Sequence, residues 1–229
     1  MFTKESLKKV VSLMKATEKE YAKVETENIK LCISKGNRKI GRCLNVSLPP
    51  VLTCANCKEC KNYCYDIKAC LQYPETVIDA RIRNYILMKY NPEKYFNDIR
   101  KACKGRRKNK FFRWHVAGDI PSMEYFKNMI QIAKEFPGFI FWTYTKNYSL
   151  VNQYCDEFGK ESIPVNLSIM FSEWKGMPIE NPHNFPEFRC VFPDEKPAKG
   201  FTKCPGNCEI CTSNKTGCPY GKNKYVDLH

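Results

Sequence analysis

The chain has 229 residues, of which 43% are hydrophobic, and this length and composition exclude a disordered chain and allow a substantial core. No apolar run approaches the roughly 18 residues that cross a bilayer, and the amphipathic start lacks a signal-peptide core, so we expect a cytoplasmic protein with no membrane partner. The net charge of +14 predicts a polyanionic partner, most commonly nucleic acid, either DNA or RNA. A lysine-rich surface that serves solubility alone is the alternative.

The N-terminal region is predicted to contain one helix and two strands. Residues 4–23 place apolar side chains three and four positions apart, which is typical of an amphipathic helix that packs on a core. Residues 28–34 and 39–47 then alternate apolar and polar side chains, which predicts two strands joined by a turn at 35–37. A Pro-Pro pair ends this region and leads into a cysteine-rich loop.

The cysteine-rich loop covers residues 54–70. Four of its thiols have the spacing C-x2-C-x2-C-x3-C, at Cys54, Cys57, Cys60 and Cys64. Such dense thiols must converge on disulfides, zinc or an iron–sulfur cluster, and a reducing cytoplasm favours metal over disulfides. The spacing matches the bacterial ferredoxin run, whereas a structural zinc site usually takes two well-separated pairs. We therefore predict an iron–sulfur cluster, with zinc as the alternative metal and with Cys43 and Cys70 as reserve ligands.

Two helices are expected next, one starting at Pro74 and the other running from Pro92 to about Cys103. Arg81 and Asn84 lie one turn apart on the first of these helices, away from its apolar stripe. These two side chains are candidates for contact with a substrate, and solvated positions on an exposed helix face are the alternative interpretation.

A strongly basic segment follows. It has seven basic residues and no acid: Lys101, Lys104, Arg106, Arg107, Lys108, Lys110 and Arg113. Basic side chains neutralise phosphates, so this segment predicts binding to the backbone of a nucleic acid. Aromatic residues at its end could stack on unpaired bases, but they also fit a buried strand, which is the favoured interpretation.

Strands and helices then alternate along the chain. The predicted strands are 111–117, 139–144, 163–171 and 188–192, and the predicted helices are 121–136 and 150–158. Alternation with short turns implies parallel strands joined by right-handed crossovers. The predicted fold class is therefore α/β, an incomplete (β/α) barrel-like parallel sheet with cysteine-rich metal-binding loops near the N-terminal third and at the C-terminus.

Three polar residues lie along or just after these strands, whose carboxyl ends carry the sites of parallel sheets. Asp119 is a candidate general base or nucleophile, and Lys146 is a candidate for holding a phosphate or carboxylate. His115 is a candidate proton shuttle if its pKa is near neutral. The alternatives are a helix cap for Asp119, a surface turn for Lys146 and a hydrogen-bonded core position for His115.

A second group of cysteines lies near the C-terminus. Its spacing is C-x3-C-x2-C-x6-C, at Cys204, Cys208, Cys211 and Cys218. The first three have the spacing of radical S-adenosylmethionine clusters, but a fourth thiol would close the iron that such clusters leave open. A structural or electron-transfer cluster, or zinc, is therefore predicted here, giving one or two 4Fe–4S clusters in the chain.

We expect a single domain over residues 1–229, because this length suits one core. Within it, an N-terminal helix and strand (1–38) precede the α/β core (39–192), and a cysteine-rich metal-binding tail (193–229) follows. The sequence leaves the oligomeric state open.

Several motifs occur together in a fixed order. They are a cysteine-rich loop ending in Cys-Tyr, an Arg-x2-Asn helix, a strand ending in Gly-Asp, a strand ending in Tyr-Thr-Lys and a terminal cysteine cluster. This set resembles the phage "gene product 88" family and, more distantly, phage proteins related to radical S-adenosylmethionine barrels. The resemblance implies a phage or mobile-element origin and points to Cys57, Cys60, Cys64, Arg81, Asn84, Asp119 and Lys146. Because the first loop lacks C-x3-C-x2-C, S-adenosylmethionine is a disfavoured cofactor.

These features predict an iron–sulfur or zinc metalloprotein that acts on nucleic acid by base modification or exchange. Asp119 would supply acid–base or nucleophilic chemistry, Lys146 and Arg81 would hold phosphate or substrate, and the basic segment would bind the backbone. The alternative is a non-catalytic nucleic-acid-binding protein whose metals only stabilise the fold.

Overall fold

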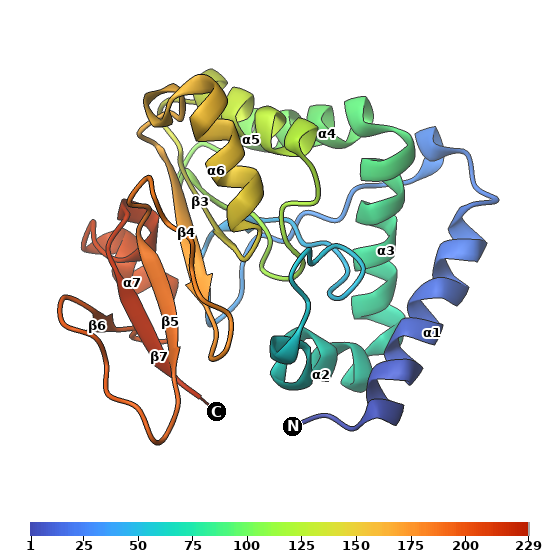
Figure 1. Ribbon diagram of the computed structural model, residues 1–229. Coiled ribbons are helices and arrows are strands. Elements are labelled where there is room, and N and C mark those ends of the chain that lie inside the picture. Colours follow the sequence, from blue (N-terminus) through green and yellow to red (C-terminus); the bar gives the residue numbers. More distant parts are fainter. Residues whose placement is uncertain (229) are drawn as a thin grey trace.

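The computed structural model describes residues 1–228, so residue 229, the last of the predicted tail, lies outside the described residues. The helices are α1 (Lys4–Tyr21), α2 (Tyr65–Gln72), α3 (Pro74–Tyr90), α4 (Pro92–Lys104), α5 (Met123–Glu135), α6 (Tyr148–Phe158) and α7 (Cys208–Ser213). The strands are β1 (Leu44–Asn45), β2 (Phe111–Arg113), β3 (Ile140–Thr145), β4 (Leu167–Glu173), β5 (Glu187–Val191), β6 (Thr202–Lys203) and β7 (Lys224–Asp227). Figure 1 shows their arrangement.

The strands form one sheet in the order β1-β2-β3-β4-β5-β7-β6, and every neighbouring pair is parallel. The predicted parallel α/β fold is therefore confirmed. Over residues 1–228 the sheet is open, with β1 and β6 at its edges, so the predicted barrel-like closure is not confirmed. A parallel sheet places the carboxyl ends of its strands along one edge and the amino ends along the opposite edge, and this decides which site residues can meet.

The two faces of the sheet pack against different parts of the chain. Phe141 and Ile169 belong to the main core, which the helices cover. Side chains alternate along a strand, so Trp142 and Met170 point to the other face, where they pack with Cys218. Figure 1 shows α7 and the last strands on the side away from α1 and α3. The C-terminal cysteines therefore lie on the face opposite the helices.

Local signals in the sequence set the helix boundaries. Pro74 and Pro92 occupy the first positions of α3 and α4, where a residue without an N–H group is tolerated. The Asn91 side chain accepts a hydrogen bond from the backbone N–H of Lys94 (3.1 Å), and Ser122 caps α5 in the same way. The predicted helices are confirmed with small shifts at their ends.

Two strand predictions are wrong in part. The hairpin expected from 28–34 and 39–47 reduces to two isolated antiparallel bridges, Ser34 with Asn45 and Asn37 with Gly41, because β1 pairs in parallel with β2 instead. The strand expected over 111–117 ends at Arg113, since the backbone of His115 turns into the left-handed region with φ 50°.

The predicted cysteine-rich tail contributes strands to the sheet. β7 pairs with β5, and β6 pairs with β7, so two later strands extend the sheet beyond the strand expected at 188–192. Both are short and carry no clear alternation of apolar and polar residues, which explains why the sequence did not indicate them. Among residues 1–228, no helix combines the length and the apolar character needed to cross a bilayer.

Candidate functional site

Asp119 lies in the segment that follows β2, at the edge where the strands end. It is 4% exposed and accepts hydrogen bonds from the hydroxyl of Thr145 (2.6 Å) and from the backbone N–H groups of Ile120 (2.7 Å) and Lys146 (2.8 Å). Burial raises the pKa of this carboxyl, and the three donors oppose that rise. The side chain therefore joins the segment after β2 to the end of β3, and much of its hydrogen-bonding capacity is used.

Lys146 is the first residue after β3 and lies at the same edge. Its ammonium group donates to the hydroxyl of Ser172 near the end of β4 (2.9 Å). Its backbone carbonyl accepts a hydrogen bond from the side-chain amide of Asn56, which belongs to the cysteine-rich loop. One half-buried residue thus connects the ends of β3 and β4 to that loop.

His115 lies in the core between two hydroxyl groups. Its Nδ1 is 3.3 Å from the Oγ1 of Thr143, its Nε2 is 3.1 Å from the hydroxyl oxygen of Tyr125, and the residue is 3% exposed. Burial lowers the pKa of the imidazole to about 3, so the ring is neutral at pH 7. The condition for a proton shuttle, a pKa near neutral, is therefore not met.

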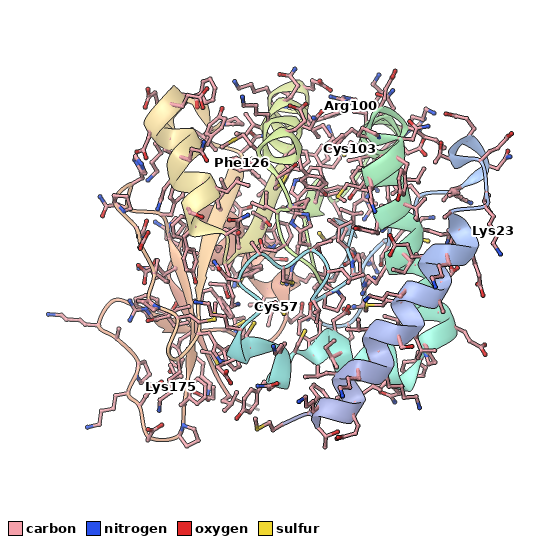
Figure 2. The ribbon with its side chains drawn as sticks, turned by 45° about the vertical axis from the view of Figure 1, so that its right-hand side comes forward. Lys23, Cys57, Arg100, Cys103, Phe126 and Lys175 are labelled. Carbon is pink, nitrogen blue, oxygen red and sulfur yellow. The ribbon has the colours of Figure 1, made fainter. Side chains whose placement is uncertain are left out.

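The first cysteine group (Cys54, Cys57, Cys60 and Cys64) lies near the middle of the molecule, where Figure 2 labels Cys57. The Cys57 thiol contacts the thiols of Cys54 and Cys60, and these contacts raise its pKa. The contact with Cys57 lowers the pKa of Cys60 to about 7, and the charge of Lys146 acts in the same direction. Burial raises the pKa of Cys64 to about 11. Cys60 is therefore a thiol whose ionisation is favoured here, unlike Cys57 and Cys64, and the thiolate is the form that binds metal.

Arg81 and Asn84 are engaged in contacts inside the protein. Arg81 forms a bidentate pair with Asp66 (2.9 and 3.2 Å), which lies in the first turn of α2, just after the first cysteine group. The buried amide of Asn84 bonds the backbone N–H and carbonyl of Cys32 and the carbonyl of Ser47. Both side chains thus fix the segments that lead into and out of the cysteine-rich loop.

A pocket of about 550 Å³ is lined by basic and amide side chains. This basic pocket consists of Lys35, Arg42, Arg106, Arg107, Lys108 and Asn109. Arg106 donates hydrogen bonds to the backbone carbonyls of Arg42 (3.0 Å) and Asn109 (3.4 Å), and so holds the two contributing segments together. The basic segment expected to bind phosphate therefore shares a concave surface with residues that precede β1.

The other predicted basic residues lie outside this lining. Lys101, Lys104 and Lys110 are exposed, and Lys101 pairs with Asp98 (3.3 Å). The basic pocket sits at the amino end of β2, whereas Asp119 and Lys146 lie at the carboxyl ends of the strands. The structure therefore places the predicted backbone-binding segment and the predicted catalytic residues at opposite edges of the sheet.

The second cysteine group (Cys204, Cys208, Cys211 and Cys218) lies on the sheet face opposite the helices. The backbone N–H of Cys208 donates to the carbonyl of Lys39 (2.9 Å), and the hydroxyl of Ser168 on β4 donates to the carbonyl of Cys218 (2.7 Å). Burial raises the pKa of Cys218 to about 12, and the other three thiols of the group act in the same direction. The structure thus gathers cysteines from two turns of the tail into one region.

The predicted metal ligands stay predictions. Over residues 1–228, no three His, Cys, Asp or Glu side chains have the arrangement of a bound metal ion, and the 14 cysteines there are free thiols. Each cysteine group offers sulfur ligands alone, a donor set that suits iron–sulfur clusters and zinc. Holding a metal requires the thiols of each group to turn toward one another.

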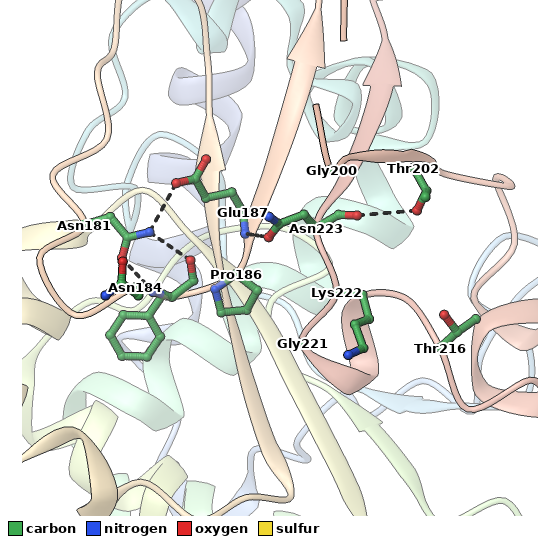
Figure 3. A pocket seen from close by; sticks show the side chains of 11 residues that line it. Asn181, Asn184, Pro186, Glu187, Gly200, Thr202, Thr216, Gly221, Lys222 and Asn223 are labelled. Carbon is green, nitrogen blue, oxygen red and sulfur yellow. Dashed lines mark hydrogen bonds between the residues drawn. The ribbon is translucent and has the colours of Figure 1, made fainter. Parts of the chain in front are cut away.

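A further pocket, of about 640 Å³, lies where β5 and β7 begin (Figure 3). The amide of Asn181 donates to the carboxylate of Glu187 (3.2 Å) and to the carbonyl of Phe185 (2.8 Å). The backbone N–H of Glu187 donates to the side-chain oxygen of Asn223 (2.8 Å). These bonds hold the loop before β5 to the start of β7, which accounts for the polar lining.

Lys35 and Arg42 are the candidate binding residues that the sequence-based prediction missed. A local signal was present, because residues 35–42 carry four basic side chains and no acid. The hydrogen bond from Arg106 to the carbonyl of Arg42, by contrast, joins positions that are 64 residues apart, and nothing in the local pattern indicates it.

Fold and site together define an α/β protein with an open parallel sheet, two groups of gathered thiols and a basic pocket. The chain matches the family model for gene product 88 over residues 12–224, and it therefore belongs to the gene product 88 family. This match confirms the resemblance to that phage family. Comparison with curated proteins and with solved structures gave no match, and the more distant resemblance to radical S-adenosylmethionine barrels has no support.

Proposed function

We propose that this protein binds the phosphate backbone of nucleic acid through the basic pocket and holds metal with its two cysteine groups, as an iron–sulfur or zinc protein of phage or mobile-element type. The basic pocket carries this proposal. Five positive side chains line this pocket of about 550 Å³, and such a concentration of positive charge attracts the phosphate groups of a nucleic-acid backbone. The net charge of +14 adds long-range attraction for a polyanion.

The metal part of the proposal is supported by the chemistry of the thiols. In the first cysteine group, the contact with Cys57 and the charge of Lys146 both lower the pKa of Cys60 and so favour its thiolate, which is the form that binds metal. The pair of Arg81 with Asp66 fixes the chain just after this group. A thiolate-bound cluster supplies electron transfer or a structural cross-link, and zinc in the same position supplies a cross-link.

Binding without catalysis is the version that the geometry favours. Asp119 is buried and accepts three hydrogen bonds, which suits a structural role. Base modification or exchange is a second candidate, because Lys146 and Cys60 are neighbours at the edge where parallel sheets bind their ligands. Mass spectrometry of nucleosides from cells that express the wild type or Lys146→Ala tests it: a modified nucleoside that depends on Lys146 supports an enzyme, and identical nucleosides contradict one.

Fluorescence anisotropy with labelled single-stranded DNA or RNA tests the binding proposal. We expect the affinity to fall steeply between about 50 and 200 mM salt. Arg106→Ala with Arg107→Ala should reduce the slope of log K against log salt by about 1.4, since each phosphate contact on a single strand contributes ~0.7. Lys8→Ala with Lys9→Ala removes the same charge from the exposed face of α1 and is the control. A flat salt response, or equal effects of the two double variants, contradicts the proposal.

A further inference from the structure

Arg113 lies apart from the rest of the basic segment. It is the last residue of β2, and its side chain is on the sheet face that carries the second cysteine group. The guanidinium carbon is 4.7 Å from the centre of the Tyr144 ring, and Nη1 is 4.0 Å from the sulfur of Cys208. A guanidinium stacked on an aromatic ring and directed at sulfur is not placed to meet a nucleic-acid backbone in solvent.

Two N–H groups near these cysteines are buried and have no hydrogen-bond partner within residues 1–228. They are the Nε of Arg113 and the Nε1 of Trp142. Trp142 packs with Cys43 and Cys218 on the same face of the sheet. Buried donors without partners are uncommon in native proteins, and each calls for a ligand or an acceptor.

The absence of a side chain at Gly217 leaves room for the sulfur of Cys211. A Cβ atom at Gly217 would lie 2.6 Å from the sulfur of Cys211, so only glycine fits this position without a shift. Gly217 also has φ 71°, which other residues rarely adopt. Its neighbour Cys218 is in turn held against β4 through Ser168.

Cys43 is a fifth thiol in this region, and its geometry separates it from the other four. Its sulfur donates to the carbonyl of Leu44 (3.0 Å), and the residue is 2% exposed. The thiol of Cys43 therefore already has a hydrogen-bond acceptor, whereas the Nε–H of Arg113 and the Nε1–H of Trp142 have none within residues 1–228.

We propose that Cys204, Cys208, Cys211 and Cys218 form one closed four-thiolate metal site, and that Arg113 and Trp142 donate N–H groups to its sulfurs. This inference rests on the metal binding proposed above, and it reassigns Arg113 from nucleic acid to the metal site. Four thiolates outweigh the charge of the metal that they hold, so the buried guanidinium would offset part of the excess negative charge. N–H donors to ligand sulfur are a recognised means of orienting ligands and tuning a thiolate centre.

Four variants, purified without oxygen, test the proposal. Cys208→Ser removes a ligand, Arg113→Met removes the charge and the donors but keeps a side chain that packs on Tyr144, and Trp142→Phe removes one N–H group. Lys8→Ala removes the same charge from the exposed face of α1, away from the basic pocket and both cysteine groups, and is the control. The readouts are iron, zinc and acid-labile sulfide per chain, and the amount of metal retained against increasing chelator.

We expect Cys208→Ser to lose the metal of one site. Arg113→Met should weaken metal retention by roughly 10- to 100-fold, the usual effect of removing a group that supports a metal ligand, and Trp142→Phe should weaken it by less. Lys8→Ala should match the wild type. Equal retention by wild type, Arg113→Met and Trp142→Phe would overturn the roles of the two donors, and full metal content in Cys208→Ser would overturn the site. A wild type without metal would instead refute the metal part of the proposed function.

Discussion

The hydroxyl of Thr145 donates a 2.6 Å hydrogen bond to the carboxylate of Asp119, and both residues are almost completely buried. The same hydroxyl accepts a hydrogen bond from the backbone N–H of Asn147 (2.9 Å), whose side chain reaches back to the carbonyl of Ile120 (3.0 Å). This network ties the segment after β2 to the start of α6. Asp119 therefore stabilises the edge of the sheet at which the first cysteine group lies.

Asp119→Asn should destabilise the protein. An amide has one acceptor oxygen where the carboxylate has two, so the N–H of Lys146 or of Ile120 would lose its partner, at a cost of about 1–3 kcal/mol. Urea unfolding measures this loss, and Asp156→Asn is the control because Asp156 is largely exposed. Oligonucleotide affinity should be unchanged, since the basic pocket lies at the opposite edge. A fully stable Asp119→Asn would contradict the structural role.

His115 should make the fold sensitive to acid. Its pKa is about 3 when folded and 6.5 in the unfolded chain, so below pH 6.5 the unfolded state takes up a proton that the folded state excludes. The free energy of unfolding should therefore fall as the pH falls, by at most about 1.4 kcal/mol per pH unit from this residue.

The contribution of His115 is the difference between wild type and His115→Asn, because asparagine tolerates the left-handed backbone at this position. Unfolding free energies between pH 7 and pH 4 should show a steeper loss for the wild type. Asp119 acts in the opposite direction, since its raised pKa favours protonation of the folded state. Its contribution to the pH dependence is the same in both proteins and cancels in the comparison. Parallel pH curves for the two proteins would rule out a buried neutral imidazole.

Gly118→Ala should disturb the contact between the Asp119 segment and the chain that leads into the cysteine-rich loop. Gly118 has φ 82°, and an added Cβ would lie 2.7 Å from the hydroxyl oxygen of Thr53 and 2.9 Å from the carbonyl of Leu48. We expect a loss of about 2–4 kcal/mol, from the left-handed backbone and from overpacking. Gly200 has a similar φ of 87° with open space around it, so Gly200→Ala should lose only the stability that the left-handed backbone costs an alanine. Equal losses would show that the close packing at Gly118 is absent.

Removing metal from the second cysteine group should weaken nucleic-acid binding. The N–H of Cys208 is bonded to Lys39, and Arg106 is bonded to Arg42, so α7 and the basic pocket share one short segment of chain. If that segment loosens, ordering it again costs ~1–2 kcal/mol per residue, and affinity should fall roughly tenfold. Anisotropy with Cys208→Ser and with chelator-treated wild type measures this change. Cys60→Ser is the comparison, because its site lies at the other edge.

The sequence predicted the helices and the central strands well, for identifiable reasons. Pro74 and Pro92 mark helix starts, and the apolar spacing of α1 and the β-branched and aromatic residues of β3 are local signals. The hairpin expected around residues 28–47 failed because β1 pairs with β2, a strand far along the chain that nothing in the local pattern indicates.

The candidate site was harder to predict because its contacts are long-range. The sequence located the cysteine groups and the basic segment. It did not indicate that Asn84 bonds Cys32, which is 52 residues away, or that Arg81 pairs with Asp66. Residue type indicates what a side chain can bind, whereas its partner depends on which distant segment the sheet brings beside it.

The metal content of protein purified without oxygen tests the central claim most directly. The account predicts iron with acid-labile sulfide, or zinc, bound to the wild-type chain, with a loss of part of that metal in Cys57→Ser and of a separate part in Cys208→Ser. A wild-type chain that carries neither iron nor zinc, and takes up neither when both are supplied under reducing conditions, would contradict it.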